Sequence, residues 1–63
     1  MFYVLHRPRD TDKPWLELPY RGKKEALAAV KTLESQKKED GTRILNVKLC
    51  IGRGRDRREI LRF

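Results

Sequence analysis

One segment constrains the fold of this chain more than any other: apolar residues alternate with other residues over residues 42–51. One face of this segment is wholly aliphatic, with Leu45, Val47, Leu49 and Ile51. The opposite face carries Ile44, Asn46, Lys48 and Cys50. This period of two predicts a half-buried β-strand, whose aliphatic face needs a second apolar surface to pack against.

The only surface large enough to cover that face is a helical stripe just upstream. Its members are Ala26, Ala29, Val30 and Leu33, spaced at i, i+3, i+4 and i+7. Gly22 serves as N-cap and places Glu25 in the first turn, where a negative charge suits the helix dipole. Gly41 is the expected left-handed residue after the last turn, so we predict a helix of about 17 residues that begins at Lys23.

Two strands are predicted before this helix. Residues 2–7 are rich in aromatic and β-branched side chains, which is typical of a strand. Residues 8–14 contain two prolines and two aspartates and predict a turn. Residues 15–18 alternate again and predict a second strand that ends at Pro19. The two strands are expected to form a hairpin.

Residues 52–63 have two interpretations. The first five, GRGRD, are turn-like, and residues 57–63 then alternate and include Ile60, Leu61 and Phe63. Apolar content of this kind favours a short fourth strand that forms a hairpin with the third, with Phe63 covering the edge of the core. The alternative is a basic tail that frays, as chain ends commonly do.

Together these elements predict an α+β fold of order β-β-α-β(-β), in a single small domain over residues 1–63. A right-handed crossover between the second and third strands places the third strand beside the first. The expected strand order is therefore 2-1-3-4, with every neighbouring pair antiparallel. One helix covers only one face of such a sheet.

The uncovered face should present a mixture of aromatic and basic residues. Alternation assigns to it Trp15, Glu17, Asn46, Lys48 and Cys50, and also Arg58, Ile60 and Arg62 if the fourth strand exists. The first strand contributes either Phe2, Val4 and His6 or Tyr3, Leu5 and Arg7. Such a face can stack bases of single-stranded nucleic acid on its rings and bind phosphates through its cations. The alternative role of Trp15 and Tyr3 is to fill the edge of a small core.

Charge points to a polyanionic partner. Sixteen Lys and Arg residues stand against nine Asp and Glu residues, which gives a net charge of +7. A strongly basic domain is the usual electrostatic signature of a nucleic-acid-binding protein. The Gly-Arg-Gly-Arg turn adds glycines that allow close backbone approach and arginines that bind phosphate oxygens in a bidentate manner. The candidate binding residues for DNA or RNA are Arg53, Arg55, Arg57, Arg58, Arg62, Lys48, Arg43, Arg7 and Trp15.

The sequence offers little for catalysis or metal binding. A single cysteine and a single histidine exclude an intrachain disulfide and a zinc site built from several Cys and His ligands. A Cys50–His6 pair across the sheet is the one nucleophile–base arrangement to consider. We expect a protein that is not an enzyme and has no cofactor. No apolar run is long enough to span a membrane, and no signal peptide is recognisable, so we expect a cytoplasmic, reduced protein.

The stretch WLELPYRGKKEALAAVKTLE follows the predicted hairpin and opens the helix with K-K-E-A. It resembles the strand-to-helix joint in the arm-type DNA-binding domains of tyrosine-type integrases, and in small phage inhibitors that clamp host RNA polymerase. The integrase arm has three strands before its helix, whereas two are predicted here, and the phage inhibitor is acidic, whereas this chain is basic. The resemblance implies a phage or mobile-element origin and transfers no residue roles.

Two functions follow as hypotheses. The first is a small, regulatory nucleic-acid-binding protein whose arginines contact the backbone. The second is an adaptor or inhibitor that docks on the acidic surface of a host nucleic-acid enzyme, anchored by Trp15 or Phe63. A homodimer that covers the open face of its own sheet is a third arrangement.

Overall fold

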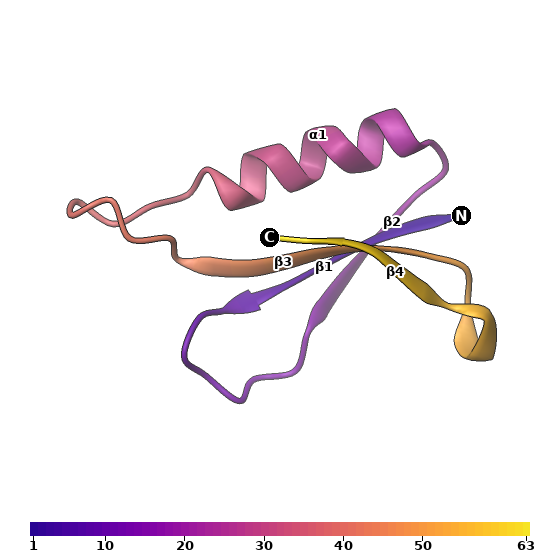
Figure 1. Ribbon diagram of the computed structural model, residues 1–63, viewed down its shortest axis with the longest axis horizontal. Helices are drawn as coiled ribbons and strands as arrows, with labels where there is room; N and C mark the ends of the chain where they lie inside the picture. The colour runs from indigo at the N-terminus through magenta and orange to yellow at the C-terminus, as the bar shows by residue number, and fades with distance from the viewer.

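Strand β3 (Leu45–Ile51) lies inside a four-stranded sheet, with β1 (Phe2–Pro8) on one side and β4 (Arg58–Arg62) on the other. Strand β2 (Leu16–Tyr20) forms the second edge, and helix α1 (Lys23–Glu34) lies on one face (Figure 1). The computed structural model describes residues 1–63. Its strand order is β2-β1-β3-β4 and all neighbours are antiparallel, which confirms the predicted α+β topology.

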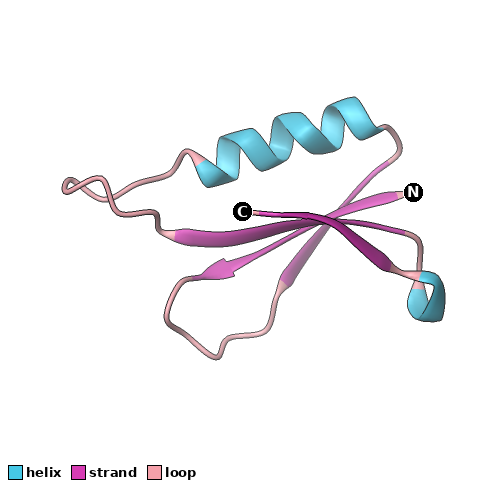
Figure 2. Cartoon of the chain, viewed as in Figure 1, coloured by secondary structure: helices cyan, strands magenta, loops and turns pink.

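The core forms where α1 packs on β1, β2 and β3 (Figure 2). Its buried members come from both predicted patterns: Val4, Ala26, Val30, Val47 and Leu49. The helical stripe therefore meets the aliphatic face of β3, as its spacing predicts. Because Val4 belongs to this cluster, Tyr3 and Leu5 face away from the helix, and this settles the orientation of the first strand.

Helix α1 has 12 residues, so the expectation of about 17 residues ending before Gly41 is wrong. The positions that would continue the stripe after Leu33 are Gln36 and Lys37, and a further turn would therefore bury no apolar surface. Ser35 ends the helix, and its hydroxyl donates a hydrogen bond to the Thr32 carbonyl at 2.8 Å. Neither the length nor the hydropathy of α1 is sufficient to cross a membrane.

Residues after the helix form a narrow loop instead. Lys37 bridges to Arg43, and the Gly41 N–H donates to the Lys38 carbonyl at 2.9 Å. Gly41 has the expected positive φ of 87°, but it serves the tip of this loop and not a helix end.

Strand β2 continues through Pro19 to Tyr20, so the prediction that Pro19 ends the strand is also wrong. Pro19 lies opposite Tyr3 on a strand that forms the edge of the sheet. An edge strand has one free side, and a residue without an N–H is tolerated there.

Strand β4 is present, which confirms the hairpin interpretation of residues 52–63. Its register shifts at one point: Cys50 opposes Glu59, and Leu49 opposes Leu61. Ile60 is therefore the extra residue of a β-bulge.

The bulge changes which side chains of β4 share a face. Arg62 lies opposite Lys48 and Glu59 opposite Cys50 on the uncovered face, as expected for Arg62. Arg58, however, lies opposite Ile51 on the helix side, so its assignment to the uncovered face is wrong. The prediction rests on uniform alternation along residues 57–63. One inserted residue places Arg58 and Arg62 on opposite faces of the sheet.

Phe63 pairs with Val47 through two backbone hydrogen bonds, of 2.8 and 3.3 Å, just beyond the end of β4. Its side chain remains 37% exposed. Phe63 is not among the residues that pack against the core, so the prediction that it covers the edge of the core is not confirmed.

Leu49→Ala should destabilise the protein by about 2–5 kcal/mol, because Leu49 is fully buried between α1 and the sheet. A chain of this size has a total stability of about 3–9 kcal/mol, so this loss is a large fraction of the total. Leu16→Ala is the control, since Leu16 is 59% exposed, and it should change the stability by less than about 0.5 kcal/mol. Urea unfolding followed by circular dichroism measures both. Equal losses would contradict this account of the core.

Candidate nucleic-acid interface

The face opposite α1 carries a second, smaller apolar cluster. Tyr3, Leu5 and Cys50 are only 4%, 7% and 3% exposed, although no helix covers them. Trp15 packs against this cluster. The remaining cover consists of long cationic side chains, whose methylene stems and planar groups can shield an apolar surface while their charges stay in water.

Trp15 is held by two of these cations. The Arg7 Cζ lies 4.6 Å and the Lys48 Nζ 4.4 Å from the centroid of its ring. Each such contact contributes about 0.5–1 kcal/mol at an exposed site. A base that stacks on this ring has to compete with both cations. The contacts of Trp15 in the free protein therefore match its alternative role, in which the side chain fills the edge of a small core.

The Gly-Arg turn has a defined backbone. Gly54–Asp56 forms a 3-10 turn, in which the Asp56 N–H donates to the Arg53 carbonyl at 3.0 Å. Gly52 has φ of 90°, and a Cβ at this position would lie 2.6 Å from the Asp56 carbonyl oxygen. Gly52 is therefore required both by its left-handed conformation and by the close approach of the chain.

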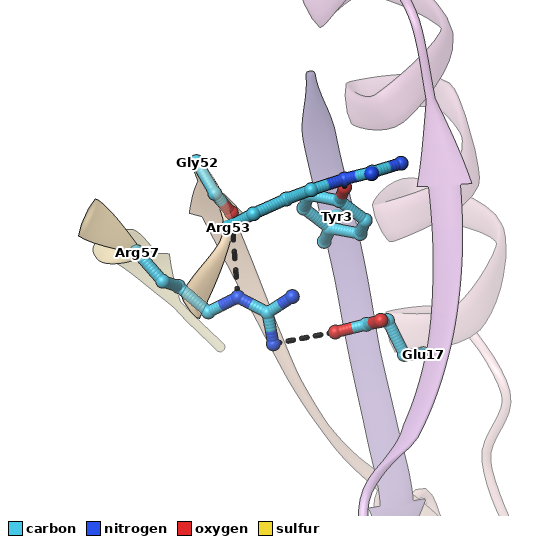
Figure 3. Close-up of polar contacts among 5 residues, drawn as sticks. All are labelled: Tyr3, Glu17, Gly52, Arg53 and Arg57. Atoms are coloured by element: carbon cyan, nitrogen blue, oxygen red, sulfur yellow. Dashed lines mark hydrogen bonds and ion pairs between the residues drawn. The ribbon is translucent and has the colours of Figure 1, made fainter. Parts of the chain in front are cut away.

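Two arginines of this segment turn back onto the sheet and meet at Tyr3 (Figure 3). The Arg53 Nε donates a hydrogen bond to the Tyr3 hydroxyl, and this bond raises the pKa of Arg53 above its usual value. The Arg57 Cζ lies 4.6 Å from the centroid of the Tyr3 ring. Tyr3 thus anchors the turn to β1, and its buried ring is not free to stack on a base.

Arg57 also reaches across β1 to the edge strand β2. Its Nη1 lies 2.5 Å from Glu17 Oε1, and its Nε donates to the Gly52 carbonyl at 3.4 Å (Figure 3). Arg57 therefore links β1, β2 and the turn, three segments that are distant in the sequence.

A second ion pair lies on β4. Arg62 donates from Nε and Nη2 to the two oxygens of Glu59, at 2.7 and 3.1 Å. This bidentate contact lowers the pKa of Glu59, and the charge of Lys48 acts in the same direction. It also raises the pKa of Arg62.

These residues define a surface that we call the cationic face. Its cations are Arg7, Lys48, Arg53, Arg57 and Arg62. Two carboxylates, Glu17 and Glu59, lie among them, so three of the five positive charges have no carboxylate partner. An excess of this kind on a surface that no helix covers attracts phosphate groups.

The other three candidate cations lie elsewhere. Arg55 is exposed at the tip of the Gly-Arg turn and makes no ion pair. Arg58 is exposed on the helix side of β4. Arg43 precedes β3, at the opposite end of that strand from the turn (Figure 1). The four arginines of residues 53–58 are therefore close in sequence but do not form one patch.

Sequence reasoning missed the roles of two acids and a tyrosine. Glu17 lies on the face that alternation assigns to it, whereas Glu59 reaches this face only through the bulge at Ile60, since uniform alternation places it on the helix side. Each binds an arginine of the cationic face, a pairing that the sequence does not reveal. Tyr3 was a candidate for the open face, and its function as the anchor of the turn depends on contacts with residues about 50 positions away.

The Cys50–His6 pair considered from the sequence does not form. Cys50 lies opposite Tyr3 on the uncovered face, whereas His6 lies opposite Val47 on the helix side. No group of three or more His, Cys, Asp or Glu residues is arranged to hold a metal ion.

Comparison with protein-family models, curated proteins and solved structures gave no match to this chain.

Gly52→Ala should destabilise the protein more than Gly41→Ala, by about 1 kcal/mol or more. Both glycines have a positive φ, but only at Gly52 would a Cβ clash with backbone, whereas at Gly41 it would meet open space. Urea unfolding of the two variants measures the difference. Equal effects would show that the turn does not approach itself closely at Gly52.

The carboxyl pKa of Glu59, measured by NMR titration, should lie below the usual glutamate value because Arg62 hydrogen-bonds to the ionised form. Arg62→Gln should move it back towards that value, while Arg55→Gln should leave it unchanged. Because the folded pKa is lowered, the contact stabilises the fold above the usual glutamate range, and this contribution disappears as the pH falls through the folded pKa. A pKa that does not respond to Arg62→Gln would contradict the ion pair.

Proposed function

We propose that this protein binds nucleic acid through the cationic face and acts as a small regulatory binding protein, not as a catalyst. The observation that carries the proposal is the set of five cations against two carboxylates on a sheet face that no helix covers. The net charge of +7 supports it by attracting any polyanion from a distance.

The contacts favour recognition of the phosphate backbone over recognition of bases. The Tyr3 ring is buried beneath Arg57, and the Trp15 ring is occupied by Arg7 and Lys48. Guanidinium groups bind phosphates strongly, but phosphate contacts carry no sequence information. We therefore expect binding that depends weakly on sequence and strongly on salt.

The three cations without carboxylate partners set the expected salt dependence. For duplex DNA, each neutralised phosphate contributes about 0.9 to the slope of log K against log salt, so the slope should be about −2.7. Fluorescence anisotropy with labelled duplex DNA, single-stranded DNA and RNA, between about 50 and 200 mM salt, measures this slope and identifies the preferred nucleic acid.

Lys48→Gln/Arg53→Gln should weaken binding several-fold and make the slope shallower, by up to about 1.8 for duplex DNA, because both are cations of the cationic face without a carboxylate partner. Lys24→Gln/Lys31→Gln removes the same charge from exposed positions of α1 and is the matched control. The variant of the cationic face should lose more affinity than the helix variant. If the two lose the same affinity, the cationic face is not the binding site, and if no nucleic acid binds at micromolar protein, the proposed function is wrong.

A second candidate function is docking on an acidic surface of a host nucleic-acid enzyme. It is favoured by the helix side of β4, which α1 does not cover and where Leu61 and Phe63 are 41% and 37% exposed. Phe63 is a freer anchor than Trp15, because Trp15 is engaged by two cations. A pull-down from nuclease-treated lysate separates the two functions: a partner that is lost with the nucleic acid favours direct nucleic-acid binding.

A further inference from the structure

Both carboxylates of the cationic face occupy arginine donors that a phosphate would use. Glu59 accepts two parallel hydrogen bonds from Arg62, and Glu17 accepts one close contact from the terminal nitrogen of Arg57. Arginine binds phosphate through the same donors, and with the same bidentate geometry that Arg62 shows towards Glu59. In the free protein each glutamate therefore occupies donors that a phosphate would use.

Strand register places these two sites far apart across the face. Glu17 lies opposite Leu5, Leu5 opposite Lys48, and Lys48 opposite Arg62. This row crosses all four strands, so Glu17 and Arg62 are separated by three strand spacings, about 14 Å. Lys48 lies between them without a carboxylate partner of its own. A phosphate chain that crosses the sheet over Lys48 would meet an arginine already engaged by a glutamate on each side.

Both ion pairs are open to exchange. The side chains of Arg57 and Glu17 are 30% and 40% exposed, and those of Arg62 and Glu59 are 69% and 37% exposed. Ion pairs at such exposure are weak, so an incoming phosphate can replace the carboxylate without unfolding the strand that carries it.

We propose that Glu17 and Glu59 are internal competitors for phosphate, which limit the affinity of the cationic face. In the wild-type protein each glutamate keeps one arginine neutralised, so the three cations without carboxylate partners carry the binding. This inference rests on the proposed function and adds the two residues that restrain it. Removing either negative charge frees one arginine, adds one phosphate contact and increases the number of counterions released on binding.

The test uses Glu17→Gln, Glu59→Gln and the double variant, with the labelled nucleic acid that the wild-type protein binds best as the probe. Glu39→Gln is the control, because Glu39 is an exposed acid in the loop after α1 and makes no ion pair. Each test variant should bind about two- to five-fold more tightly than Glu39→Gln. The salt slope should also steepen by about 0.9 per glutamate on duplex DNA or about 0.7 on a single strand.

The outcomes separate this inference from the proposed function. If the wild-type protein binds but the test variants bind no more tightly than Glu39→Gln, the glutamates do not compete with phosphate. If they bind more weakly, the ion pairs position the arginines for binding, and the inference is again wrong. If no form of the protein binds, the proposed function itself is wrong. Glu59→Gln leaves the Arg57 contacts intact, so the test remains decisive even if Glu17→Gln loosens the turn.

Discussion

A four-stranded sheet has two faces, and this chain has one helix with which to cover them. Helix α1 buries the aliphatic face of β3 and β1. The other face can be covered only by side chains of the sheet and of its loops. Tyr3, Leu5 and Cys50 on that face are nevertheless buried, because Trp15 and the cations around it fold over them. The arginines and Lys48 of the cationic face are therefore part of the packing as well as part of the charge.

This double role links stability to binding. Arg57 contacts the Tyr3 ring, Glu17 and the turn backbone, so its removal would expose apolar surface and release the turn in addition to removing a charge. Arg55, by contrast, is exposed and holds nothing in place. Arg55 lies outside the cationic face, however, and at Arg57 any loss of binding has to be compared with the loss of fold. Few cations of this face can therefore be replaced to change the charge without also changing the packing.

Most of the fold could be predicted from the sequence, because the two periodic patterns that produce it are local. A few neighbouring residues are enough to recognise the helical stripe from Ala26 to Leu33 and the alternation around Val47. The right-handed crossover then predicts the strand order. The predicted helix end is wrong because Gly41 lies at the tip of the following loop. A further helical turn after Leu33 would bury no apolar side chain. The face of Arg58 was misplaced because a bulge at Ile60 has no signature in the alternation. The candidate site was predicted as a set of cations, but their pairing with Glu17, Glu59 and Tyr3 depends on contacts between distant strands.

The bulge at Ile60 and the proline at position 19 lie on the two outer strands of the sheet. A regular outer strand presents an unbroken ladder of donors and acceptors, on which another chain can align and from which fibrillar assembly can grow. Here one edge strand lacks an N–H donor at Pro19, and the other is distorted by the inserted residue Ile60, which follows the charged Glu59. A chain with this much extended backbone is thereby protected from joining its own copies edge to edge.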